Sequence, residues 1–191
     1  CTDYTATNYN AAANTDDGSC TYLAIGDTHQ GGIVFYLDGN GGGLIAAPSD
    51  QSSGAQWGCY GTNLGGAGGE DIGTGTQNTI DIINANCTSS NGTPTAADIC
   101  ANLVLAGYTD WFLPSIDELW KMYSNIGQGD GYTSSSGLGN IGGFANNRYW
   151  SSTEYGSVQA MFQNFYPWPS GYQSASIKDD NGHFVRAVRA F

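Results

Sequence analysis

Basic side chains, histidines and long apolar runs are all scarce in this sequence. Its 191 residues contain five Lys or Arg against 17 Asp or Glu, and the net charge is −12. So few cations cannot neutralise a row of phosphates, which excludes nucleic acid and acidic membrane surfaces as partners. No run of about 18 apolar residues is present either, so we expect no membrane span.

The scarcity of histidine argues against a metal enzyme, which needs clustered His, Cys and carboxylates. The two histidines, His29 and His183, lie near glycines in expected turns. Ser115, Asp117 and Glu118 open an expected helix, where a capping hydroxyl and acidic side chains are stabilising without any chemistry. We therefore predict no catalytic residues and no enzymatic activity.

Charged residues make up 12% of the chain and aromatic residues 13%, a combination that disfavours disorder. With 29 glycines, we expect a loop-rich fold whose core contains Trp and Tyr. The acidity suits calcium or neutral polar ligands such as sugars. Five cysteines indicate an oxidising setting, extracellular or at the cell surface. Two sequons make Asn86 and Asn91 candidate glycosylation sites.

Residues 1–25 form a polar N-terminal extension, called the extension below, that is too small to have its own core. Cys1 and Cys20 bracket it, and a disulfide between them is the expected constraint. Five side chains in it are candidate calcium ligands, since hard cations take such oxygens: Asp3, Asn8, Asn10, Asp16 and Asp17. The alternative is that these side chains cap turns.

Residues 26–191, called the body below, are expected to form a single α+β domain around residues 107–123. There a short apolar run ends at Pro114, and Ser115 with Glu118 forms a capping box that begins a helix. A second capping box, Thr95 with Asp98, precedes an expected helix at residues 96–106. A further short helix is expected at residues 76–85.

Apolar runs predict strands at residues 32–37, 44–47, 149–152, 158–165, 174–178 and 184–191. The first two form a hairpin. A buried strand that ends a domain pairs well with the strand that began it. We therefore expect the closing strand to pair with residues 33–37.

Three cysteines remain once Cys1 and Cys20 are paired. We prefer a Cys87–Cys100 bridge, because Cys87 follows one expected helix and Cys100 lies in the next. Cys59 is then either a buried free thiol or is bonded to another chain.

Several blocks in the body match a known pattern in order: Gly32-Ile-Val-Phe-Tyr, Ala47-Pro-Ser-Asp, Trp57-Gly-Cys-Tyr-Gly, Gly107-Tyr-Thr-Asp-Trp-Phe-Leu-Pro-Ser, Asp117-Glu-Leu, Tyr149-Trp-Ser-Ser-Thr-Glu and Val185-Arg-Ala-Val-Arg. They resemble the bacterial Lcl C-terminal-domain-like family. The resemblance implies a C-type-lectin-like fold with an antiparallel sheet, paired terminal strands, two to three helices and long irregular loops. It also implies a secreted or surface-displayed adhesion module. The extension resembles linker repeats between modules of long bacterial surface proteins, which implies an array or linker role.

Residues 149–172 are rich in aromatic side chains among small polar ones, which is typical of a contact surface for proteins or sugars. The candidate interface residues are Tyr155, Tyr166, Trp168 and Tyr172. Residues 166–169 are expected either to form an exposed interface or to pack as a loop.

Two functions fit these observations. The first is a non-enzymatic extracellular structural or adhesive protein, a subunit or repeat of a surface fibre that assembles head to tail through the extension. Its partners would be other copies of the chain in a helical or linear array. The alternative is an adhesin module that binds a glycan or a protein through residues 149–172.

Overall fold

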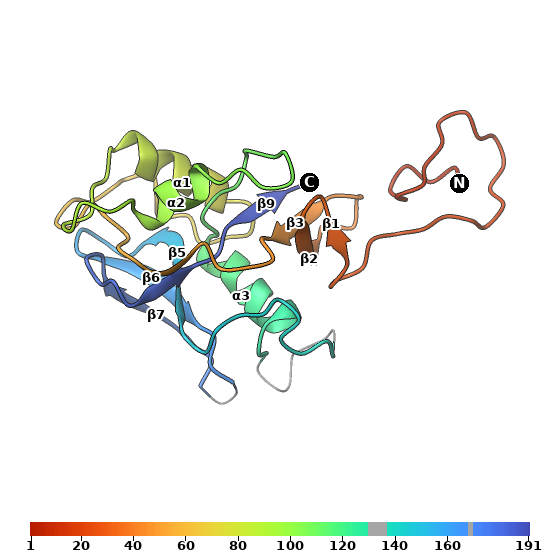
Figure 1. The fold of residues 1–191 in the computed structure, drawn as a ribbon. Helices are drawn as coiled ribbons and strands as arrows, with labels where there is room; N and C mark the ends of the chain where they lie inside the picture. Colours follow the sequence, from red (N-terminus) through yellow and green to blue (C-terminus); the bar gives the residue numbers. More distant parts are fainter. Residues whose placement is uncertain (130–136, 168–169) are drawn as a thin grey trace.

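The computed structural model describes residues 1–129, 137–167 and 170–191, and in it the apolar run Gly32–Leu37 forms a strand, β2, that is buried on both faces. Val34 packs into one hydrophobic cluster and Phe35 into another. This double burial explains why the run is continuously apolar, since a strand with one solvated face would alternate. The chain has an α+β fold with three helices and two sheets (Figure 1).

The first sheet is antiparallel and has the order β1-β2-β3-β9. Its other strands are β1 (Thr28–His29), β3 (Gly43–Ala46) and β9 (Val188–Ala190). The expected hairpin of β2 and β3 is confirmed. The expected pairing of the closing strand with β2 is wrong, because β1 and β3 occupy both edges of β2 and β9 pairs with β3 instead.

The second sheet has the order β4-β8-β5-β6-β7 and contains one parallel pair, β5 with β8. Its strands are β4 (Ser52–Ala55), β5 (Arg148–Glu154), β6 (Gln159–Asn164), β7 (Gln173–Ile177) and β8 (His183–Val185). The single closing strand predicted at residues 184–191 is wrong, since the chain leaves the second sheet after β8 and enters the first as β9. Arg186 anchors the crossing, because its buried guanidinium pairs with Asp50 and donates to the Ala47 carbonyl oxygen.

The helices are α1 (Gly75–Asn84), α2 (Ala96–Ala101) and α3 (Ile116–Ile126). Both predicted capping boxes, Thr95 with Asp98 and Ser115 with Glu118, are confirmed. The predicted helix at residues 96–106 is too long. The chain turns back there because Leu105 and Tyr108 exchange backbone hydrogen bonds of 3.1 and 3.0 Å around a left-handed Ala106.

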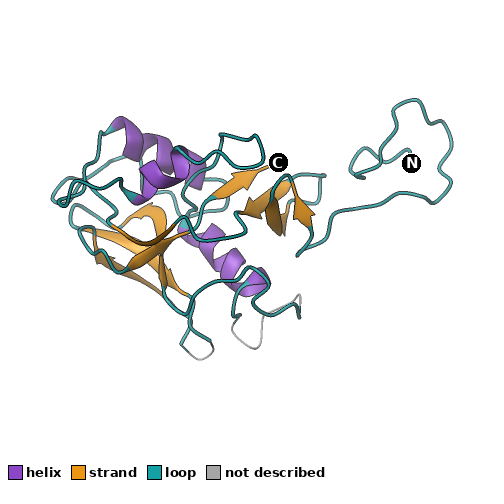
Figure 2. Ribbon diagram, viewed as in Figure 1, coloured by secondary structure: helices purple, strands orange, loops and turns teal. Residues whose placement is uncertain are grey.

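The helices lie on opposite sides of the sheets, with α1 and α2 on one side and α3 on the other (Figure 2). The cluster on the α1 and α2 side includes Trp57, Ile82 and Trp150, and the cluster on the α3 side includes Met122 and Phe165. In the described part of the chain, no helix has the length and apolar character needed to cross a membrane.

The disulfides correct one sequence prediction and confirm another. Cys1 is bonded to Cys20, as predicted. Cys87 is bonded to Cys59 and not to Cys100, which is the free and buried thiol. The reason is local geometry: the Gly58 turn lies against Cys87, whereas Cys100 points from α2 into the core, where burial raises the pKa of its thiol.

Candidate functional site

The extension stands out from one end of the body, beside the first sheet (Figure 1). Its order comes from the disulfide and from hydrogen bonds, since Ala6 is its one buried residue. The Asn8 side chain accepts from the Thr21 N–H at 3.0 Å and donates to the Ser19 carbonyl oxygen at 2.6 Å. The extension is therefore shaped mainly by bonds within itself.

The five candidate calcium ligands serve as capping groups in these turns. Asn10 accepts from the Ala12 N–H, Asp16 from Gly18 and Asp17 from Ser19, each at 3.0 Å. Asp3 accepts from the Thr5 N–H and from the Tyr22 hydroxyl, and Asn8 bonds as described above. Residues 1–129, 137–167 and 170–191 contain no group of three or more His, Cys, Asp or Glu placed to hold a metal ion. Each of the five side chains therefore has a turn-capping hydrogen bond, as the alternative expected, and calcium binding by them remains a prediction.

The electrostatics of the extension agree with this role. The Thr5 backbone N–H, together with the Tyr22 hydroxyl, holds the pKa of Asp3 below its ordinary value. Hydrogen bonds from Ser19 do the same for the pKa of Asp17. Both carboxylates are therefore ionised at neutral pH and committed to the turns.

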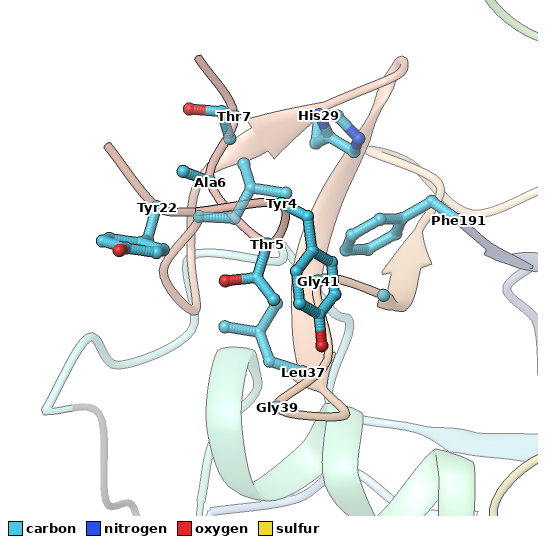
Figure 3. Close-up of a pocket in the computed structure, with 12 residues that line it drawn as sticks. Tyr4, Thr5, Ala6, Thr7, Tyr22, His29, Leu37, Gly39, Gly41 and Phe191 are labelled. Carbon is cyan, nitrogen blue, oxygen red and sulfur yellow. The ribbon is translucent and has the colours of Figure 1, made fainter. Parts of the chain in front are cut away.

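A groove of about 260 Å³ separates the extension from the body. Tyr4 and Tyr22 line it from the extension, and His29 and Phe191 line it from the body (Figure 3). The floor is the glycine-rich turn between β2 and β3. There Gly41 lies so close that a Cβ on it would be 3.1 Å from the Thr5 Cα atom.

The groove combines aromatic faces with an uncharged lining. Tyr4 is 72% exposed and Tyr22 54% exposed, while His29 meets Phe191 edge to face with ring centroids 4.7 Å apart. Among the described residues that line it, none is Asp, Glu, Lys or Arg. In a chain with a net charge of −12, a lining without charged side chains suits a planar or polyhydroxylated ligand.

The predicted interface at residues 149–172 is divided by the fold. Tyr155 is exposed at one end of β6, where its N–H donates to the Gln159 carbonyl oxygen. Tyr172 is exposed near the other end, where its carbonyl oxygen accepts from the Asn164 N–H. The six residues of β6, Gln159 to Asn164, span five steps and place these ends about 17 Å apart. The remaining aromatic residues of this stretch are accounted for as follows: Tyr166 is exposed, Tyr149, Trp150, Phe162 and Phe165 are core, and Trp168 lies outside the described residues.

The two candidate glycosylation sites are both exposed. Asn86 follows α1 in a left-handed backbone conformation, with φ of 51°. The Asn91 amide donates to the Asn181 side-chain oxygen at 3.1 Å. Their modification remains a prediction.

Three of the five basic side chains are used in ion pairs within the body. Lys178 is fully buried and its Nζ atom lies 2.6 Å from a Glu154 oxygen. Arg186 pairs with Asp50, and Arg189 pairs with Asp110. Each of these ion pairs joins two segments that are distant in sequence, so the three cations stabilise the fold. Because they are used inside the body, the exposed surface is left strongly acidic.

Glu118 is the buried acid with the clearest structural function. Its carboxylate accepts from the Ser115 and Gly73 N–H groups, both at 2.8 Å, where α3 and α1 begin. A Cβ on Gly75 would lie 2.3 Å from this carboxylate, so only glycine fits there. Burial raises the pKa of Glu118, while these N–H donors lower it. The carboxylate therefore joins two helix N-termini inside the body.

His183 is buried with its ring stacked on Trp150 at a centroid distance of 3.9 Å. Its Nδ1 atom lies 3.6 Å from an Asp180 oxygen. Burial lowers the pKa of His183 to about 4, although Asp180 works in the opposite direction. The imidazole is therefore neutral at neutral pH and acts as an aromatic core residue.

Sequence reasoning did not identify the groove beside the extension, although one signal for it exists. Residues 39–43 are four glycines and one asparagine, which is an unusually bare turn. Such a turn permits close backbone approach, and here the extension approaches it.

Neither a scan against protein-family models nor a search of curated proteins found a match to this chain.

Proposed function

We propose that this chain is an exported, non-enzymatic structural or adhesive protein whose copies assemble head to tail through the extension. The observation that carries the proposal is a projecting segment that holds its own shape and keeps most of its surface in solvent. Tyr9 is 47% exposed and lies within the uncharged segment of residues 9–13.

The disulfide and the side-chain hydrogen bonds of the extension order it without contact to a neighbouring copy. A pre-ordered segment loses less conformational entropy when it docks, which favours binding. Contact between the extension of one copy and a different surface of the next generates an open array.

Two further features support this proposal. The Cys59–Cys87 and Cys1–Cys20 bridges suit an oxidising, extracellular or cell-surface location. The resemblance to the Lcl C-terminal-domain-like family, with a C-type-lectin-like fold, is part of the proposal. The α+β architecture with long loops is compatible with it.

Electron microscopy and light scattering of the purified chain at increasing concentration test the proposal. The unmodified chain is expected to form linear particles, and Tyr9→Ser to remain monomeric. Tyr60→Ser is the matched control, because Tyr60 is 53% exposed but lies on the body. Dispersed monomers of the unmodified chain at every concentration, or arrays that persist in Tyr9→Ser and without residues 1–22, would refute it.

A second function, glycan binding, is favoured by the neutral groove with its exposed Tyr4 and Tyr22 rings. Sugars stack on such rings, and the division of residues 149–172 makes this groove the better candidate. Binding to neutral oligosaccharides on an array should be lost in Tyr4→Ala and kept in Tyr60→Ala. The absence of binding by the unmodified chain would exclude this function.

A further inference from the structure

Strand β7 lies at the outer edge of the second sheet (Figure 1). In the described chain its only strand partner is β6, in an antiparallel register that runs from Gln163 with Gln173 to Gln159 with Ile177. Among the described residues, its opposite edge therefore has no strand partner.

The register identifies which backbone groups face outward. The Asn164 backbone N–H donates to the Tyr172 carbonyl oxygen, and the Lys178 backbone N–H donates to the Val158 carbonyl oxygen. Asn164 with Tyr172, and Val158 with Lys178, are therefore hydrogen-bonded pairs. Because such pairs alternate in an antiparallel ladder, Ser174 and Ser176 bond to β6, whereas Gln173, Ala175 and Ile177 direct their backbone groups outward. Of these groups, the Ile177 carbonyl oxygen accepts from Asp180, and the rest have no partner among the described residues.

This edge lacks the usual protection against pairing. Natural proteins block exposed edges with lysine, proline, inward-pointing charges or bulges. Strand β7 reads Gln-Ser-Ala-Ser-Ile, without charge or proline, and its pairing with β6 has no bulge. A shallow cavity of about 340 Å³ lies beside it, lined by residues that include Tyr155, Met161 and Ala175.

We propose that β7 pairs with β7 of a second copy, antiparallel and centred on Ala175. This register brings the outward N–H and C=O groups of the two Ala175 residues together. It also sets Gln173 of each copy against Ile177 of the other. The side chains that meet are Ser174 with Ser176 and Gln173 with Ile177, which are uncharged pairs.

A second copy is the occupant that the register fits, because the outward N–H and C=O groups of Ala175 in one β7 meet the same groups of the other. Two chains that each carry a net charge of −12 repel one another over most of their surfaces, and β7 is an edge without charge. Five residues on each side bury less surface than a stable dimer requires. The contact is therefore weak for one pair and requires high protein concentration, and it is independent of the head-to-tail assembly.

The test is done in the Tyr9→Ser background, so that its outcome is separate from that of head-to-tail assembly. Sedimentation of this protein at rising concentration should approach twice the monomer mass. Exchange of the Gln173, Ala175 and Ile177 amide hydrogens should slow in parallel. Ala175→Pro removes an outward N–H and leaves the β6 ladder intact, so that variant should stay monomeric.

Two more variants at the same position keep the test decisive. Ala175→Glu places like charges directly opposite each other across the pair and should also abolish pairing, even if the proline variant fails to fold. Ala175→Thr keeps the N–H group and β propensity, and should pair like the parent. Concentration-independent exchange at the three amides, or a dimer that persists in Ala175→Glu, would overturn the proposal.

Discussion

Removal of the two disulfides, one at a time, should have unequal effects on the body although their loops are similar in length. Cys59–Cys87 closes a separation of 28 residues and Cys1–Cys20 closes 19. Loop-closure entropy assigns about 3.5 kcal/mol to the first and about 3 kcal/mol to the second. The entropies alone therefore predict nearly equal losses of stability.

The positions of the loops in the fold make the effects differ. The loop between Cys59 and Cys87 includes α1 and the buried Ile82, so its constraint acts on the body core. Cys59→Ser/Cys87→Ser should therefore lower the midpoint of the main unfolding transition by about 7–14 °C, at about 2–4 °C per kcal/mol. The loop between Cys1 and Cys20 lies in the extension, so Cys1→Ser/Cys20→Ser should leave that transition almost unchanged.

Differential scanning calorimetry measures the main transition, and hydrogen exchange follows the extension. In the Cys1→Ser/Cys20→Ser variant, the Thr7 and Thr21 amides should exchange faster, because their bonds to Thr21 and Asn8 depend on the closed loop. If this variant instead lowered the main transition as much as the other, the extension would belong to the cooperative unit of the body. The boundary at residue 25 would then be wrong.

Three further predictions concern the charged groups. Lys178→Met should lower the free energy of unfolding in urea by about 3–5 kcal/mol, because it leaves Glu154 buried without its cation. Adding Glu154→Gln should recover part of this loss. An unchanged free energy of unfolding in Lys178→Met would refute this role of Lys178. The pKa of His183 in the folded chain, about 4, is below the ordinary value of 6.5. The contribution of His183 to the free energy of unfolding is therefore complete above pH 6.5 and is lost as the pH falls towards 4. This loss of stability is about 3 kcal/mol, and His183→Gln should flatten the dependence of the free energy of unfolding on pH between 6.5 and 4. Equal slopes in the variant and the unmodified chain would contradict this prediction. Raising the salt concentration should promote assembly by screening the repulsion between acidic copies, as followed by light scattering, and dissolution by salt would argue for attractive ion pairs between them.

The sequence predicted those elements whose signals are local. Ser115 with Glu118 and Thr95 with Asp98 each place a hydroxyl and an acid three residues apart, and both helices begin there. The run Gly32–Leu37 is apolar at nearly every position, which is enough to identify a buried strand. In these cases the residues that decide the structure are neighbours in the chain.

The features that were missed depend on contacts between distant residues. Strand β4 reads Ser-Ser-Gly-Ala, which has little β propensity, and it forms because β8 offers an edge. The closing strand divides where Arg186 meets Asp50, 136 residues earlier in the chain. The Cys59–Cys87 pairing similarly depends on the position of the Gly58 turn relative to the end of α1.

The placement of charge links the fold to the proposed contacts. Lys178, Arg186 and Arg189 are drawn into ion pairs that join distant segments, so the body uses most of its few cations for its own stability. The exposed surface is left acidic, and contacts between copies must then occur where acidic side chains are absent. Residues 9–13 of the extension and the edge of β7 both meet this condition. They lie on different parts of the molecule, so one contact can extend an array while the other joins two arrays side by side.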